Sequence, residues 1–366
     1  MLIIDSHEDL ATNMLSYQRD YRRSALETRR LEQGKIDLDD PGECTLGWPE
    51  YQQGQVALIF STLFVAPDRY EEGGIKKQAY RDFPAAAKLY RAQVDIYQRV
   101  TDESPHQFRL VRNQRDLAVI LNAWDKTPAE FPRVTNPVGL ILLIEGLEGI
   151  RDAKELEEFW EHGVRMAGMV WAGTRLCGGA FVPDGKGFSQ EGLEFMKVMS
   201  ELGMSLDLAH MNDQSALEAL DRYQGAVLAS HVNARALIKG YSGERHFTDE
   251  VIRGLIDRDG VMGLVPFNHF LDYEWTHATG KQAITLDHLV KQVDYICQMA
   301  GNARHVAIGT DFDGGYGANA IPAEIDTIAD FQKLVPVLKS RGYAEDDIAS
   351  IMGNNWRRFV ERTLPA

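Results

Sequence analysis

Eight short apolar runs, each ending at polar or glycine residues, constrain the fold of this chain most strongly. Near-continuous apolar runs of this length are typical of parallel strands that are buried on both faces. Segments with helical periodicity separate most of them, and strand–helix alternation favours a parallel sheet. The predicted strands lie within 2–9, 55–65, 138–146, 164–173, 202–210, 225–231, 260–265 and 305–314. The predicted helices are 82–99, 189–202, 213–223, 248–257, 286–299 and 328–339.

Eight strand–helix units are the number that closes a (β/α)8 TIM barrel. A doubly wound open sheet is the alternative, but such a sheet normally carries a glycine-rich phosphate loop, and neither GxGxxG nor GxxxxGK[ST] occurs. Long insertions at 10–54, 66–137 and 173–188 are typical of loops that build the active mouth of a barrel. We therefore predict one α/β domain over residues 1–366, a (β/α)8 TIM barrel with long loop insertions at its C-terminal face.

Charge and hydropathy exclude several classes of partner. The 366 residues include 39 Lys and Arg and 54 Asp and Glu, a net charge of −15, which opposes nonspecific binding to nucleic acid or to anionic lipid. No apolar stretch reaches the ~18 residues of a membrane span, and MLIIDSHEDL lacks the basic region of a signal peptide. Three widely spaced cysteines form no disulfide framework. We expect a cytoplasmic protein that acts on a small molecule.

Ligand-type side chains cluster at the ends of five predicted strands: His7, Asp9, Glu145, His210, His231 and Asp311. In a closed parallel barrel these ends meet at one face, where barrel enzymes place catalysis. His7 and Asp9 are two residues apart and point the same way in a strand, so both could reach one ion. Imidazole nitrogen and carboxylate oxygen suit zinc, and six such groups suit two ions that share a bridge. Glu145 is the natural bridge.

Each of these residues alone has a simpler interpretation. A single histidine at a strand end is most often a hydrogen-bonded structural residue, and Asp5 could be a local cap or pairing partner. A whole group of such residues at the ends of neighbouring strands is much harder to explain in this way. His269 follows the seventh predicted strand and could lie near the site or away from it.

The ordered set resembles the membrane (renal) dipeptidase family, peptidase family M19, among the amidohydrolase-like metal barrels. The resemblance runs from residue 3 to about residue 359. It rests on five motifs taken in order: His7-x-Asp9, Glu145-Gly146, Asp207-Leu208-x-His210, Ser230-His231 and Gly309-x-Asp311-Phe312-Asp313-Gly314.

The resemblance implies a zinc-dependent dipeptidase that hydrolyses the amide bond of dipeptides with a free C-terminal carboxylate. It implies two Zn²⁺ per chain, the first bound by His7 and Asp9 and the second by His210 and His231. Glu145 and a water or hydroxide would bridge the two ions, and this hydroxide would attack the amide. A homodimer is a further expectation.

The resemblance also assigns residues outside the metal ligands. Asp311 would be the catalytic acid/base, with Asp313 as the next candidate, and Arg235 would pair with the carboxylate of the substrate. Trp171 stands where many members have a histidine that touches the substrate carbonyl, and Phe267 stands where tyrosine is common. Both changes predict a more apolar substrate-binding wall.

Other functions remain open at this point. A lactonase, a deaminase or an N-acyl-amino-acid hydrolase could use a similar binuclear site. Many such barrels bridge their metals with a carbamylated lysine late in the fourth strand, but residues 164–173 contain no lysine. A metal-binding barrel without catalysis would usually have lost a ligand or the acid/base, and all six positions are filled.

Overall fold

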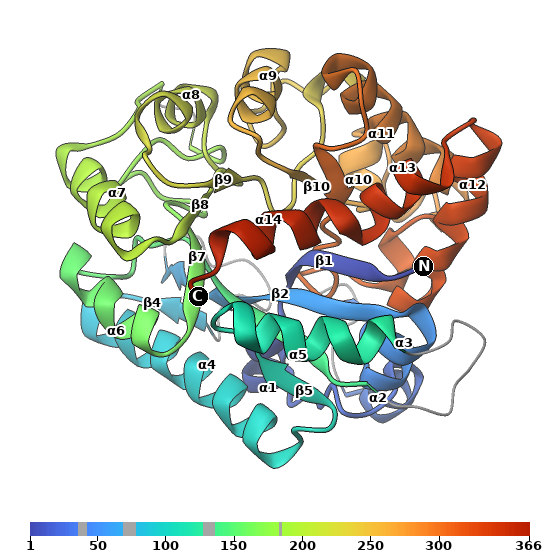
Figure 1. Ribbon diagram of the computed structural model, residues 1–366, viewed down its shortest axis with the longest axis horizontal. Coiled ribbons are helices and arrows are strands. Elements are labelled where there is room, and N and C mark those ends of the chain that lie inside the picture. The colour runs from blue at the N-terminus through green and yellow to red at the C-terminus, as the bar shows by residue number, and fades with distance from the viewer. Residues whose placement is uncertain (36–41, 69–77, 127–135, 183–184) are drawn as a thin grey trace.

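The computed structural model describes residues 1–35, 42–68, 78–126, 136–182 and 185–366 (Figure 1). Its main sheet pairs parallel strands in the order β10-β11-β1-β2-β6-β7-β8-β9. A parallel bridge between Ala229 and Met262 joins the two ends of this order, and the Gly263 amide donates to the Ala229 carbonyl at 2.8 Å. The ring is therefore closed, and the predicted (β/α)8 barrel is confirmed. That residues 1–366 form one domain stays a prediction.

Each predicted apolar run contains one strand of the barrel. The strands are β1 (Ile3–Glu8), β2 (Val56–Phe64), β6 (Val138–Glu145), β7 (Val164–Gly168), β8 (Ser205–Asp207), β9 (Val227–Leu228), β10 (Met262–Leu264) and β11 (Val306–Ile308). All eight are shorter than the runs, and His210, His231 and Asp311 each lie three residues beyond the end of a strand. Short strands β3 (Ala66–Pro67), β4 (Ala79–Tyr80) and β5 (Phe108–Leu110) lie in the second insertion.

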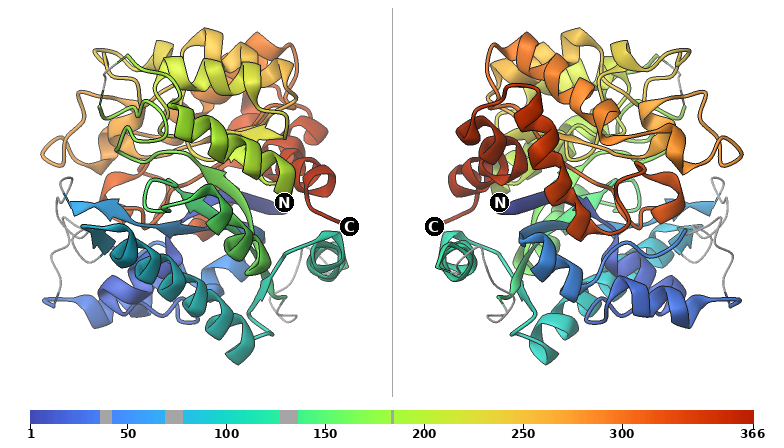
Figure 2. Two further views of the ribbon diagram at one scale, coloured as in Figure 1. Left: turned by 90° about the vertical axis from the view of Figure 1, so that its left-hand side faces the viewer. Right: turned by 90° about the vertical axis from the view of Figure 1, so that its right-hand side faces the viewer.

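Helices surround the strands, as Figures 1 and 2 show. They are α1 (Leu10–Tyr17), α2 (Ala25–Glu32), α3 (Trp48–Gly54), α4 (Phe83–Glu103), α5 (Gln114–Asp125), α6 (Leu156–Glu161), α7 (Gln190–Leu202), α8 (Asp213–Arg222), α9 (Asp249–Asp257), α10 (Asn268–Leu271), α11 (Leu286–Ala300), α12 (Leu334–Ser340), α13 (Glu345–Ala349) and α14 (Asn355–Thr363). The predicted cap Thr248 accepts from the amide of Val251 at the start of α9. The predicted helix 328–339 begins instead as a 3₁₀ helix over Ile328–Lys333, because Pro336 has no N–H to donate to the Gln332 carbonyl.

Close packing inside the barrel fixes the strand ends beneath the cluster of ligand-type residues. A Cβ atom on Gly309 would lie 1.9 Å from the Ser230 carbonyl oxygen, and one on Gly263 would lie 2.1 Å from it. The Ser6 hydroxyl fills the remaining space, within hydrogen-bond distance of the carbonyls of Ser230 and Ile308. Glycine is therefore required at both positions, and the interior leaves β9, β10 and β11 little freedom to shift.

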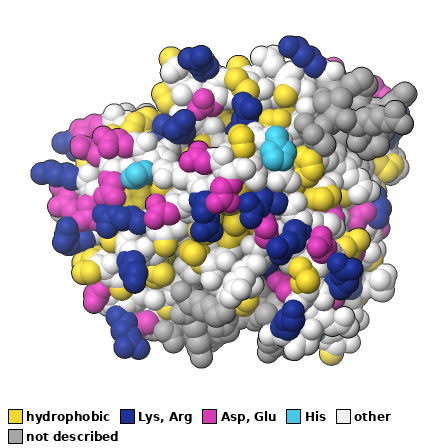
Figure 3. Space-filling view, turned by 90° about the horizontal axis from the view of Figure 1, so that it is seen from below, with side chains coloured by type: hydrophobic (Ala, Val, Ile, Leu, Met, Phe, Trp, Pro, Cys, Tyr) yellow, Lys and Arg dark blue, Asp and Glu magenta, His cyan; other side chains and the backbone are white. Residues whose placement is uncertain are grey.

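The surface carries charges of both signs. On the face shown in Figure 3, acidic and basic side chains lie next to one another among apolar ones. Among the helices of the described residues, none combines the length and apolar character needed to cross a bilayer.

The first insertion is held against the barrel by Asp313. Its carboxylate accepts from the Thr45 amide at 2.8 Å, the Thr45 hydroxyl at 2.7 Å and the Tyr21 hydroxyl at 2.8 Å. The buried Arg19 guanidinium lies 2.9 Å from Asp313 and 2.8 Å from Glu32. Asp313 therefore ties the loop after β11 to a segment nearly 300 residues earlier in the chain.

Removing Arg19 should destabilise this anchor, because Asp313 and Glu32 would be left as buried carboxylates without their cation. Arg19→Met is expected to lower the free energy of unfolding by about 3–5 kcal/mol, measured by denaturant titration. The control is Arg22→Met, which removes a partly exposed arginine that pairs with Asp20 and Glu103. It should cost no more than about 1 kcal/mol. Equal stability of the two variants would contradict the anchor.

Candidate metal centre and active site

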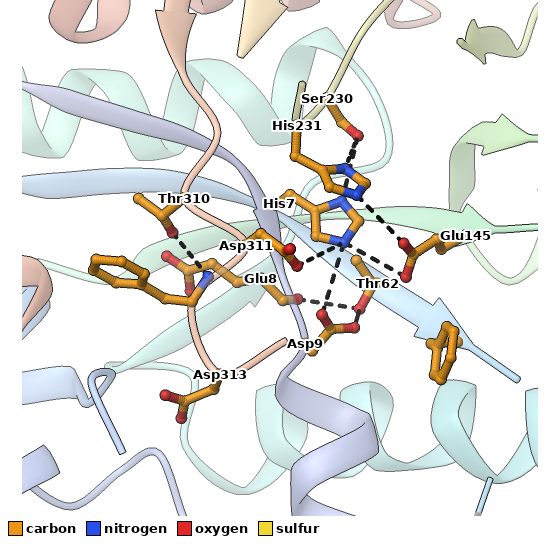
Figure 4. Close-up of polar contacts among 12 residues, drawn as sticks. His7, Glu8, Asp9, Thr62, Glu145, Ser230, His231, Thr310, Asp311 and Asp313 are labelled. Carbon is orange, nitrogen blue, oxygen red and sulfur yellow. Dashed lines mark hydrogen bonds and ion pairs between the residues drawn. The ribbon is translucent and has the colours of Figure 1, made fainter. Parts of the chain in front are cut away.

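His7 lies at the centre of the site, where three carboxylates converge on one ring nitrogen (Figure 4). Its Nε2 is 3.7 Å from Asp9 Oδ2, 3.6 Å from Glu145 Oε2 and 3.7 Å from Asp311 Oδ1. These distances are too long for hydrogen bonds, and the buried Nε2 has no hydrogen-bond partner among the described residues. Three oxygens facing one unpartnered nitrogen across such gaps form a set of donors that fits a cation.

Glu145 connects this group to two further histidines. Its Oε2 faces His7, while its Oε1 lies 2.9 Å from His210 Nε2 and 3.4 Å from His231 Nε2. The two histidine nitrogens are 2.9 Å apart. The structure therefore brings all six predicted ligand-type residues together, with Glu145 between His7 and the histidine pair.

Two overlapping triads have ligand atoms within 4.8 Å of one another: His7 with Glu145 and His231, and His7 with Asp9 and Asp311. Asp311, which the resemblance assigns to proton transfer, thus also lies within reach of the ion expected at His7 and Asp9. The donor set of imidazole nitrogens and carboxylate oxygens fits zinc or a similar divalent ion.

The electrostatics of the cluster favour an added positive charge. Burial alone would lower the pKa of His7, but Glu145, Asp9 and Asp311 outweigh it and raise the pKa to about 10. Burial raises the pKa of Asp311 well above its usual value, with Asp9 and Glu145 adding to this and His7 opposing it. Without a metal, the His7 proton is the cation that the carboxylates share.

The pKa values of His210 and His231 are shifted in the opposite direction to that of His7. Burial, together with the charge of Arg245, lowers the pKa of His210 to about 4. Burial and the charge of His7 place the pKa of His231 well below its usual value. Both rings are therefore neutral near pH 7, which is the form that binds a metal.

A hydrogen-bond chain behind the site orients the rings. The Ser230 hydroxyl donates its only proton to Asp207, while the Nδ1 atoms of His231 and His7 lie 2.7 and 3.3 Å from the same hydroxyl. Each Nδ1 must then carry the hydrogen, which leaves the Nε2 atoms as the ligands. Asp207 and Ser230 belong to the sequence motifs, but sequence reasoning gave them no role.

Several residues of the site have unusual backbone conformations. His210, Asp311 and Asp313 all have positive φ, at 66°, 55° and 61°. Non-glycine residues adopt this region at an energetic cost that is characteristic of functional sites. The Asp311 amide donates to the His7 carbonyl at 3.0 Å, which fixes the turn and aims the carboxylate at the cluster.

A cavity of about 210 Å³ opens beside the cluster. Asp9, Glu145, His210 and Asp311 form part of its wall, and seven aromatic residues line it as well: Tyr17, Phe64, Trp171, Phe181, Phe267, Phe270 and Tyr316. The predicted substrate-wall residues Trp171 and Phe267 thus both face this space. His269 is not among the lining residues, and its Nδ1 lies 3.1 Å from the Trp275 carbonyl.

The Arg245 side chain also lines the cavity. It is 2% exposed and lies over the Phe270 ring at 5.3 Å. Its Nη2 donates to the His231 carbonyl at 3.0 Å, whereas Nε and Nη1 have no hydrogen-bond partner among the described residues. Two nitrogens of this guanidinium are therefore buried beside the ligand-type residues without an acceptor among the described residues.

The structure does not bring Arg235 into this cavity. Its guanidinium forms a two-bond pair with Asp213 at 2.6 and 2.7 Å, and its Nε donates to the His246 carbonyl at 2.8 Å. Arg235 therefore ties the segment that carries Arg245 to the first residue of α8. Sequence reasoning missed Arg245, which lies in the same loop after His231, because nothing local distinguishes the two arginines.

A sequence model of the family described as membrane dipeptidase (peptidase family M19) matches residues 1–364. An uncharacterized dipeptidase of Schizosaccharomyces pombe is 25% identical, over 99% of this chain and 80% of that protein. Among solved structures, dipeptidase AC, a metallopeptidase of family M19, superposes with a TM-score of 0.78 at 21% identity, covering 100% of this chain and 99% of that chain.

A second solved structure is a metallopeptidase from Rhodobacter sphaeroides, liganded with a phosphinate mimic of the dipeptide L-Ala-D-Ala. It superposes with a TM-score of 0.78 at 20% identity and covers 99% of both chains. The whole-chain family match agrees with the cluster of ligand-type residues at the barrel mouth. The chain therefore belongs to the membrane dipeptidase family, peptidase family M19, and is a metal-dependent hydrolase.

Proposed function

We propose that this chain hydrolyses the amide bond of dipeptides that have a free C-terminal carboxylate. The observation that carries the proposal is the Arg245 guanidinium, which is buried, has no carboxylate partner among the described residues and lines the same cavity as the ligand-type residues. Arginine binds carboxylates through two parallel N–H donors. The dipeptide mimic bound by the Rhodobacter sphaeroides relative supports the same substrate class.

Two zinc ions would occupy the cluster in this proposal. His7 and Asp9 would hold the first, His210 and His231 the second, and Glu145 would offer one oxygen to each. Bound divalent ions supply an activated water and polarise the scissile carbonyl. Thr62, which donates to Asp9, and Ser230, which contacts His231, keep their partners in place.

Asp311 is the proposed acid/base. Its partly buried carboxyl lines the cavity and has a raised pKa, so it is suited to take a proton from the attacking water and give it to the leaving amine. Asp313 lines the cavity too, but its oxygens are engaged by Thr45, Tyr21 and Arg19. It is therefore a poor alternative for proton transfer.

N-acyl-amino-acid hydrolysis is the second candidate, because such substrates also present a carboxylate to Arg245 and an apolar group to the aromatic wall. Neutral lactones and nucleobase-like deaminase substrates would leave the guanidinium unpaired, which is costly. A homodimer and a cytoplasmic location are further proposals that rest on the sequence.

Zinc titration of the metal-free protein should end at two ions per chain. Binding should release protons, because His7, with a pKa of about 10, must lose its proton to bind a metal. Affinity should therefore increase as the pH is raised towards that value. Calorimetry in buffers with different ionisation enthalpies measures both quantities, and His210→Ala should bind about one ion. A wild-type titration that never exceeds one ion would refute the binuclear site.

Acid and amide versions of the same dipeptides test the proposed function and the role of Arg245. Wild-type protein with zinc should hydrolyse the acids of an L,L or L,D panel and act poorly on the amides. Arg245→Met should lower kcat/KM for the acids by about 100-fold or more, since a buried charge pair is lost, with little effect on the amides. Arg235→Met tests the assignment from the family resemblance. Equal wild-type rates on acids and amides would count against a carboxylate site.

Replacing Asp311 by asparagine removes the proton-carrying group and retains its shape. Asp311→Asn is expected to keep the wild-type zinc content, measured by elemental analysis, while kcat falls about 10²–10⁴-fold. Turnover close to wild type would mean that another group transfers the proton.

A further inference from the structure

We propose that Phe181 determines which amino-terminal residue of a dipeptide this enzyme accepts. Its ring would cover the side chain of that residue against a wall formed with Phe64 and Trp171, and so select substrates with a large apolar or aromatic amino-terminal residue. The proposal rests on the proposed dipeptidase function and adds the substrate class.

The three rings form one continuous surface. The ring centroids of Phe64 and Trp171 are 5.0 Å apart and those of Trp171 and Phe181 are 5.8 Å apart, both in edge-to-face arrangements. All three line the cavity. Phe64 is 6% exposed, whereas Phe181 is 47% exposed. One side of the Phe181 ring is packed and the other is open to solvent. Covering the open side with an apolar group removes apolar surface from water, which favours binding.

The backbone of Phe181 is fixed relative to the metal cluster. The Ala180 amide donates to the His210 carbonyl at 2.8 Å, and the Asn212 amide donates to the Gly178 carbonyl at 3.0 Å. A Cβ atom on Gly178 would lie 2.3 Å from the Asn212 side chain, so glycine is needed for this close approach. The Phe181 ring consequently lies 5.5 Å from the His210 ring, which places it beside the reacting bond.

The strand order assigns this wall to the amino-terminal residue. Phe64 ends β2 and Trp171 follows β7, and both strands lie across the ring from β10. Arg245 lies between β9 and α9 and packs on Phe270, which follows β10. A dipeptide with its carboxylate on Arg245 and its scissile carbonyl at the metal cluster therefore extends its amino-terminal residue towards Phe64, Trp171 and Phe181.

The test compares two series of dipeptides with the zinc-loaded enzyme. The first varies the amino-terminal residue from glycine through alanine and leucine to phenylalanine before a constant alanine, and the second varies the carboxyl-terminal residue. Phe181→Ala should lower kcat/KM about 10-fold or more for the leucine and phenylalanine members of the first series. The same variant should change kcat/KM for glycyl-alanine less than about twofold, and its zinc content should equal that of the wild-type enzyme. Phe181→Leu should restore most of the preference.

Val119→Ala is the control, because it removes another exposed apolar side chain, on α5. It should leave kcat/KM unchanged in both series. A uniform loss in both series, or no loss in either, for Phe181→Ala would overturn the role of Phe181 and leave dipeptide hydrolysis intact. Absence of dipeptide hydrolysis in the wild-type enzyme would instead overturn the proposed function, and the role of Phe181 with it.

Discussion

The convergence of Asp9, Glu145 and Asp311 on His7 is the interaction on which the rest of the site depends. Asp9 and Glu145 are buried and Asp311 is partly buried. The three carboxylates repel one another and each loses hydration, so they stay together only around a positive charge. In the metal-free chain the His7 proton supplies that charge, as its raised pKa shows. The same arrangement makes the site selective for a group that can replace the proton with a larger charge, which is the property expected of a metal-dependent hydrolase.

The barrel holds this unfavourable cluster in place with contacts that lie behind it. Gly263 and Gly309 let the strands approach the Ser230 carbonyl closely, and Asp207 holds Ser230 against the rings of His231 and His7. The short loop after β11 makes two different contacts. Asp311 faces the cluster, while Asp313, two residues later, binds the first insertion through Thr45. One turn therefore connects the cluster of ligand-type residues to the anchor of the first insertion.

The charged and the apolar parts of the cavity wall lie on opposite sides of the ring. On the side of β9 and β10, Arg245 supplies unpaired donors and Phe270 packs beneath them. On the side of β2 and β7, Phe64 and Trp171 supply apolar surface. In the proposed function, the charge of the substrate and its amino-terminal side chain are recognised by separate elements of the ring.

The barrel and the metal cluster were predictable from the sequence, because both depend on local patterns. An apolar run that ends in His or Asp identifies a buried strand and its catalytic end, and ring closure then brings His7, Glu145 and His231 together without further information. Arg245 and Phe181 were not predictable in this way. Both lie in loops, where no period fixes the direction of a side chain. Only the tertiary structure decides that Asp213 binds the guanidinium of Arg235 while that of Arg245 lines the cavity, because this depends on a contact between residues 22 positions apart.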